Sequence, residues 1–194
     1  ILNCLKADYG RVFKSEIITD LIKVLGCGVE LKSKHNKDLA SFSLESLRWN
    51  KVIICTDADV DGYQIRVLIL TMIYTLMPTL IEEGLVFIAE SPLYEIKTKK
   101  GSLFAYTDKE KDEIVAGLKD KAKVMRSKGL GENDPDMMWE TTMNPETRKL
   151  IRVMPEDEEV TRRMFDLLQG DNLQGRKDFI AENGYKYIDY TDVS

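Results

Sequence analysis

The sequence has few of the residues that cross-link small extracellular proteins or bind zinc. Its 194 residues include three cysteines, Cys4, Cys27 and Cys55, and a single histidine, His35. An odd number of cysteines at unrelated spacings argues against a disulfide framework, and His35 lies in a polar stretch away from all of them, which argues against a zinc site. The sequence therefore predicts a protein of a reducing compartment, the cytoplasm.

Long apolar runs and a signal peptide are also missing. The longest apolar stretch, Val67 to Met77, is interrupted by polar residues and closely followed by Pro78. It is shorter than the ~20 apolar residues that span a bilayer. No charged segment precedes an apolar one at the start of the chain, so no signal peptide is recognisable. We expect no membrane partner, and we interpret Ile1 as an internal residue of a longer protein.

Positive charge is not in excess either. Lysine and arginine total 28 against 33 aspartates and glutamates, a net charge of -5. Any contact with nucleic acid must therefore come from local clusters of cations. The 43% content of hydrophobic residues is ordinary for a globular protein and sets aside disordered and fibrous classes.

The first half of the chain has the pattern of an α/β fold. Helical periodicity followed by glycine predicts a helix that ends before Gly26, and two short β-branched runs predict buried strands on either side of a long apolar helix. Strand, helix and strand in this order predict a Rossmann-like parallel sheet flanked by helices. The expected elements are a helix over 15–25, a strand over 51–55, a helix over 63–81 and a strand over 85–89.

The second half changes to a hairpin and then to helices. We expect a charged helix over 108–118, a further strand over 123–126, and short helices that open at Asp134-Pro135 and Asn144-Pro145. Asp171 is the expected N-cap of the last helix. The remaining expected elements are hairpin strands over 93–97 and 103–106 and two closing helices over 156–168 and 172–182.

An acidic cluster directly follows the first predicted strand. Asp57, Asp59 and Asp61 alternate in the string TDADVDG, at the carboxyl end of a strand, where ligands bind in open α/β sheets. If the segment stays extended, the three carboxylates point the same way and repel one another unless a cation lies between them. Magnesium favours oxygen ligands, takes one or two protein carboxylates and leaves positions for phosphate. The cluster therefore predicts a magnesium site for phosphate chemistry.

The acidic cluster has two other interpretations. The first is a solvated turn with its tight bend at Asp61-Gly62. The second is an EF-hand, because DADVDG matches the start of a calcium loop. The twelfth loop position, however, is Leu68 instead of a bidentate glutamate, and the preceding segment is a strand instead of a helix. The EF-hand interpretation fails on both counts.

Several segments resemble one protein family in the same order. IICTDADVDGYQIRVLIL is similar to the acidic segment of the Toprim domain in the B-type subunits of DNA gyrase and topoisomerase IV, the bacterial type IIA DNA topoisomerases. SKGLGENDPDMMWETTMNPETRKLIRV resembles the tail segment of the same subunits. ILNCLKADYGRV, LIKVLGCGV and AESPLYEI also fit, so the resemblance covers nearly the whole chain.

The resemblance implies a role in double-strand DNA cleavage and religation. It implies Asp57 and Asp59 as catalytic magnesium ligands, with Asp61 as a nearby, water-mediated contributor. The family's glutamate ligand belongs to an acidic motif that this sequence does not contain, so we expect a truncated Toprim domain with little activity alone. Gln64 stands where gyrases usually have histidine.

The resemblance also implies the partners. These are double-stranded DNA and an A-type subunit that carries the attacking tyrosine, in a heterotetramer of two A-type and two B-type subunits. ATP would bind to an N-terminal region that lies outside this sequence. The sequence does not separate gyrase from topoisomerase IV.

The segment RSKGLGE is the second candidate site. Arg126 and Lys128 accompany two glycines, Gly129 and Gly131, that let the backbone approach a partner closely. A plain glycine turn before the Asp134-Pro135 helix explains the glycines equally well without any function. The family resemblance favours Lys128 as a DNA contact, with Arg126 beside it.

We therefore expect an α/β Toprim core over residues 1–98, a hairpin and charged helix over 99–127, and a small helical tail over 128–194 that packs on the core. Two alternatives stay open for the function. One is a non-catalytic metal-binding or scaffolding Toprim fragment. The other is a Toprim nuclease or primase, against which the topoisomerase-like tail argues.

Overall fold

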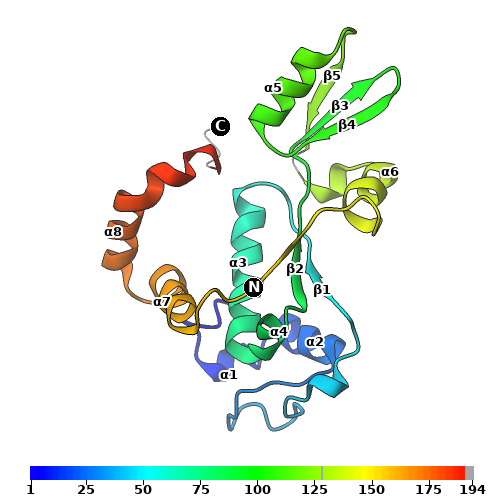
Figure 1. Ribbon diagram of the computed structural model, residues 1–194. Helices are drawn as coiled ribbons and strands as arrows, with labels where there is room; N and C mark the ends of the chain where they lie inside the picture. Colours follow the sequence, from blue (N-terminus) through cyan, green and yellow to red (C-terminus); the bar gives the residue numbers. More distant parts are fainter. Residues whose placement is uncertain (128, 191–194) are drawn as a thin grey trace. The chain divides into compact units, whose positions relative to one another are not determined.

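The computed structural model of the chain describes residues 1–127 and 129–190, and the chain forms two compact units (Figure 1). The first unit contains residues 1–52, residues 65–87 and the chain from 152 onward, and the second contains residues 53–64 and 88–151. Both units contain helices and strands, and the predicted α/β class is confirmed.

The first unit opens with two helices, α1 (Tyr9–Val12) and α2 (Glu16–Leu25). The apolar side chains Ile18, Ile22 and Leu25 of α2 are buried and share one face, as residues three and four apart do. Gly26 ends the helix in the left-handed conformation, with φ 82°, and its N–H donates to the Ile22 carbonyl. The predicted glycine-terminated helix is confirmed. A short 3-10 turn, η1 (Leu44–Ser46), follows.

The long apolar helix that we predicted over 63–81 is two helices, and the prediction of one was wrong. The structure has α3 (Val60–Leu76) and α4 (Thr79–Glu82). Pro78 has no N–H to continue the hydrogen-bond ladder and disfavours a helical conformation at Met77 before it. The start was also placed too late, because helix formation begins inside the acidic cluster.

The strands β1 (Val52–Ile54), β2 (Val86–Ala89) and β6 (Leu150–Arg152) form a sheet in the order β1-β2-β6. The first two strands confirm the predicted strands on either side of the helix. β2 is mostly buried, whereas only Ile54 of β1 is buried. The third strand was not predicted, because Leu-Ile-Arg is too short to show an alternating pattern or an apolar run.

The chain ends in the helices α7 (Glu158–Gln169) and α8 (Leu173–Asn183), followed by a 3-10 turn, η4 (Gly184–Tyr190). Asp157 caps α7 by accepting from the N–H groups of Glu159 and Val160. Asn172 caps α8 by accepting from the Gly175 N–H at 2.9 Å. The predicted cap, Asp171, is therefore one residue too early.

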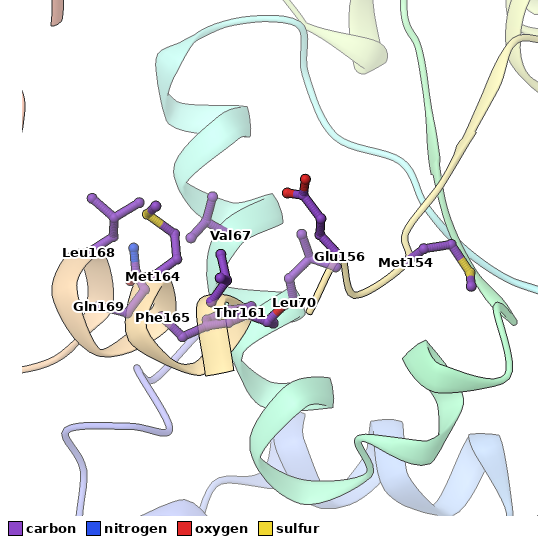
Figure 2. A pocket seen from close by; sticks show the side chains of 10 residues that line it. Val67, Leu70, Met154, Glu156, Thr161, Met164, Phe165, Leu168 and Gln169 are labelled. Carbon is purple, nitrogen blue, oxygen red and sulfur yellow. The ribbon is translucent and has the colours of Figure 1, made fainter. Parts of the chain in front are cut away.

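A groove separates α3 from α7 within the first unit (Figure 2). Tyr74 of α3 stacks on Phe165 of α7, with ring centroids 4.2 Å apart and planes inclined by 5°. The groove has a volume of about 360 Å³, and its wall is mainly apolar. Figure 2 shows Val67 and Leu70 on the α3 side and Met164 and Leu168 on the α7 side.

The second unit is built on an antiparallel sheet in the order β4-β3-β5. Its strands are β3 (Tyr94–Thr98), β4 (Gly101–Ala105) and β5 (Lys123–Arg126), which confirm the predicted hairpin and the further strand. The helix α5 (Asp108–Gly117) was also predicted. A small core of Tyr94, Ile96 and Ala105, with Ile114 of α5 packed against it, lies on one side of the sheet.

Short helical turns follow the sheet in the second unit. These are η2 (Leu130–Glu132), α6 (Pro135–Met138) and the π-helical turn η3 (Trp139–Met143). The helix expected after Asp134 is confirmed as α6, with proline in its first turn. The prediction of a helix after Asn144 was wrong. Asn144 does accept from the Glu146 N–H, but only a turn follows, because β6 begins at Leu150.

In the part of the chain that the structure describes, no helix has the length and apolar character needed to cross a membrane.

Candidate metal centre

The acidic cluster lies in the second unit, between the last residue of β1 and the first turn of α3. Ile54 at the end of the strand is buried, and so is Thr56, which is 6% exposed. Asp57 and Asp59 are half-buried, and Asp61 is exposed. The chain thus turns from a buried strand into a helix within six residues, and the carboxylates lie in this turn.

Asp59 is the N-cap of α3. Its Oδ1 accepts a hydrogen bond of 2.8 Å from the N–H of Gly62, three residues on. The first N–H groups of a helix have no partner within the helix, and a carboxylate there also interacts favourably with the positive end of the helix dipole. One oxygen of this predicted metal ligand is therefore engaged in capping.

Asp57 is held by the second sequence motif. Its Oδ1 accepts a hydrogen bond of 2.7 Å from the main-chain N–H of Leu130, 73 residues further along the chain. Gly129 lies beside the same carboxylate, since a Cβ on it would be 3.5 Å from Asp57 Oδ2. The two segments that we selected from the sequence are therefore in direct contact.

Gly62 is required by the packing of this turn. A Cβ at this position would lie 2.1 Å from the carbonyl oxygen of Asp57, far closer than atoms can approach. The absence of a side chain lets the first turn of α3 pack on the main chain of Asp57. The alternative interpretation as a solvated turn placed a tight bend at Asp61-Gly62, whereas Gly62 lies inside α3.

The three carboxylates do not alternate along an extended segment. Asp57 precedes the helix, Asp59 caps it and Asp61 lies in its first turn. Among the described residues, no group of three or more His, Cys, Asp or Glu side chains is arranged so as to hold a metal ion. The extended arrangement that we expected was wrong, because capping and dipole interactions favour helix formation from Val60 onward.

Arg126 lies at the end of β5, opposite Tyr94 of β3 in the sheet register. The Tyr94 hydroxyl donates to Asp108 Oδ1 at 2.7 Å. This hydrogen bond lowers the pKa of the Asp108 carboxyl, and hydrogen bonding to Lys111 and the nearby charge of Arg126 lower it further. Arg126 is exposed. Lys128, the other predicted DNA contact, lies outside the described residues.

Comparisons with known proteins match both candidate segments. The family model of the Toprim domain matches residues 6–91, and that of the carboxyl terminus of the DNA gyrase B subunit matches residues 119–181. The DNA gyrase B subunit of Metamycoplasma hominis is 40% identical over 195 residues, which covers 100% of this chain and 28% of that protein. The DNA gyrase B subunit of Thermotoga maritima is 43% identical over 187 residues, with 96% and 28% coverage.

The chain belongs to the DNA gyrase B family. The DNA gyrase B subunit of Archaeoglobus fulgidus is a further relative, 43% identical over 183 residues that cover 93% of this chain and 27% of that protein. The chain thus spans a little over a quarter of the length of each of these three relatives. The resemblance that we found from two motifs is confirmed, and so is the Toprim fold.

Sequence reasoning missed one group that contacts the acidic cluster of this gyrase B segment, the main-chain N–H of Leu130. We assigned the motif RSKGLGE by its cations, Arg126 and Lys128. The structure instead shows that the glycine-leucine step touches the acidic loop. The signal was the glycine itself, but a sequence does not show which partner a bare backbone approaches.

Proposed function

We propose that the chain supplies the metal-binding carboxylates of the DNA-cleavage centre of an ATP-dependent type IIA topoisomerase. The observation that supports this most is the hydrogen bond between Asp57 and Leu130, within a chain of the gyrase B family. It joins the acidic Toprim segment to the tail segment at a single point. A surface turn would not require such a contact.

Asp57 and Asp59 are the proposed ligands, each through its Oδ2, because Oδ1 of each accepts a main-chain hydrogen bond. Carboxylate oxygens are the hard donors that Mg²⁺ favours, and two of them match the one or two protein carboxylates that Mg²⁺ usually takes. Asp61, exposed in the first turn of α3, is proposed to act through a water molecule.

The buried hydroxyl of Thr56 supports the presence of a further ligand at this site. Its Oγ1 has no hydrogen-bond partner among the described residues, although buried polar groups are normally satisfied. Bound at these carboxylates, Mg²⁺ would act as a Lewis acid that stabilises negative charge on the oxygens of the scissile phosphate. The residues of this chain hold and orient the carboxylates, and the attacking nucleophile is supplied from elsewhere.

The proposed partners follow from membership of the family. Double-stranded DNA is the substrate, and an A-type subunit provides the attacking tyrosine in a cytoplasmic heterotetramer of two A-type and two B-type subunits. ATP is proposed to bind to a part of the protein outside this chain. Arg126 and Lys128 are proposed to contact DNA phosphates, which Arg126 is exposed enough to reach.

The test is DNA cleavage by the complete B-type subunit mixed with its A-type partner. Asp57→Asn removes the charge of one ligand at nearly constant size, so we expect magnesium-dependent cleavage to be abolished. Wild-type cleavage by this variant would remove Asp57 from the metal site. In the wild-type complex, introduction of supercoils would indicate gyrase, and relaxation or decatenation alone would indicate topoisomerase IV.

Two alternatives predict other outcomes. A non-catalytic scaffolding role predicts that the complete complex binds metal and its A-type partner yet never cleaves DNA. A Toprim nuclease or primase predicts cleavage or priming without an A-type partner, and the match of residues 119–181 to the gyrase B carboxyl terminus argues against it.

A further inference from the structure

The contact between the two motifs is made by a main-chain donor. At 2.7 Å, the bond from the Leu130 N–H to Asp57 Oδ1 is at the short end of the range for hydrogen bonds to an ionised acceptor. Both residues are half-buried, so water competes less for either partner than it would at an exposed site. The bond fixes one oxygen of the carboxylate and thereby the direction of the other.

The Leu130 N–H is itself held in place by the turn around it. The Ser127 N–H donates to the Leu93 carbonyl at 2.8 Å, and the Ser127 hydroxyl donates to Asn133 Oδ1 at 2.7 Å. The Glu132 N–H donates to the Gly129 carbonyl at 3.1 Å. The turn is closed by bonds on both sides of Leu130, so the donor that meets Asp57 is preorganised.

The two glycines of the motif differ in their surroundings. A Cβ on Gly129 would lie 3.5 Å from Asp57 Oδ2 and 3.6 Å from Oδ1. Gly129 has an extended backbone, with φ -161°, which any residue adopts, and a Cβ at these distances from the carboxylate would be in ordinary van der Waals contact. For Gly131, no atom of the described residues lies within 4 Å of the Cβ position.

We infer that the main-chain N–H of Leu130 is a positioning group for Asp57, an inference that rests on the proposed function. It holds Oδ1 so that Oδ2 is presented to the metal. Hydrogen-bond partners of metal ligands typically change metal affinity by about 10- to 100-fold when they are removed. The tail segment therefore tunes the metal site of the Toprim segment.

The test removes the donor with little change to the backbone. Leu130 is the first residue of η2, where proline is tolerated, and Gly129 before it is extended, as the residue before a proline must be. Leu130→Pro thus deletes the N–H. Leu130→Ala, the matched control, shortens the same side chain but keeps the N–H. Replacing the Leu130 amide by an ester provides a second deletion without a ring.

Two quantities are measured on the complete complex with its A-type partner. One is Mn²⁺ affinity without DNA, from paramagnetic resonance titration, and the other is the Mg²⁺ concentration for half-maximal DNA cleavage. Relative to Leu130→Ala, we expect Leu130→Pro and the ester to bind Mn²⁺ about tenfold or more weakly. We expect the Mg²⁺ concentration for half-maximal cleavage to rise by a similar factor. If the bond were merely structural, its loss would instead lower the melting temperature and leave both metal dependences unchanged.

The inference would be overturned if Leu130→Pro and the ester had the same Mn²⁺ affinity and the same Mg²⁺ requirement for cleavage as Leu130→Ala. Asp57→Asn, measured in parallel, tests the proposed function separately. If Asp57→Asn loses Mn²⁺ binding and cleavage while Leu130→Pro behaves like Leu130→Ala, the inference alone fails. If Asp57→Asn keeps Mn²⁺ binding and DNA cleavage, Asp57 is not a metal ligand, and the positioning role of Leu130 is also wrong.

Discussion

Two acidic runs in this chain have the same local structure and different surroundings. Residues 57–61 follow β1 and open α3, and residues 156–159 follow β6 and open α7. In both runs an aspartate is the N-cap, Asp59 in the first and Asp157 in the second. Helix capping and the helix dipole explain acids at both places.

What separates the two runs is contact with distant residues. The acids of the second run are exposed, and Asp157 accepts from the N–H groups of its own helix, Glu159 and Val160. In the first run, Asp57 accepts from Leu130, 73 residues away, and Gly62 is packed against the Asp57 main chain. The comparison teaches that an acidic helix start needs no function, whereas a long-range contact that orients a carboxylate calls for an explanation.

The most direct test of this difference between the two acidic runs is to make the same substitution in both. Asparagine caps a helix about as well as aspartate, so Asp59→Asn and Asp157→Asn both keep their helices, with a change in the free energy of unfolding of roughly 1 kcal/mol or less. We expect Asp59→Asn to abolish Mg²⁺-dependent DNA cleavage by the complete complex and Asp157→Asn to leave it unchanged. Cleavage assays and thermal unfolding of the two variants check this.

Full-rate cleavage by Asp59→Asn would show that its carboxylate only caps α3. Loss of cleavage in Asp157→Asn would show that the second run also matters, and the contrast between the two runs would fail.

The next largest effect concerns the third residue of each helix. A methyl group on Gly62 would meet the Asp57 carbonyl oxygen at 2.1 Å, so Gly62→Ala forces the main chain apart. We expect it to lower the free energy of unfolding by about 1–3 kcal/mol, as overpacking does, and to impair cleavage by displacing Asp57. Val160, the equivalent residue of α7, is 52% exposed. Val160→Ala should change the stability by no more than about 0.5 kcal/mol.

Denaturant unfolding of the two variants measures this difference. Equal stabilities for Gly62→Ala and Val160→Ala would mean that the close packing of α3 on Asp57 does not contribute to the fold.

A smaller effect is expected at the cations of the second motif. Lys128→Ala should weaken DNA binding by the complete complex about equally for all sequences and lower the slope of log affinity against log salt by about one unit. Lys119, exposed just after α5, is the control, and Lys119→Ala should change neither quantity. A wild-type salt slope for Lys128→Ala would leave the segment with its contact to Asp57 and no role in DNA binding.

The last prediction concerns calcium, for which we expect the weakest effect, little or no binding at the acidic loop. An EF-hand needs a twelve-residue loop that ends in a bidentate glutamate. Here the residues from Val60 onward are helical, and the twelfth position is Leu68. Titration calorimetry should show calcium binding weaker than roughly micromolar, outside the range of sensor EF-hands. A dissociation constant at or below roughly micromolar would contradict this assignment of the acidic loop.

The strands, the hairpin and most helices were predictable because each is determined by local pattern. The break at Pro78 was overlooked because the apolar pattern continues through it, although proline chemistry accounts for it. The start of α3 was misplaced because Asp59 suits both an extended metal loop and a helix cap, and a single sequence does not decide between them. The contact of Leu130 with Asp57 could not be predicted, since it joins a backbone donor to a carboxylate 73 residues away.

The central claim is that a divalent cation binds at Asp57 and Asp59, and the most direct test locates the metal. Fe²⁺ can replace Mg²⁺ in the complete complex, and with ascorbate and hydrogen peroxide it cuts nearby main chain at sites that mass spectrometry maps. We predict cuts within residues 57–62 and 129–131, brought together by the bond from Leu130 to Asp57, and their loss in Asp57→Asn. Cuts confined to residues 156–159, or none at 57–62, would contradict the account.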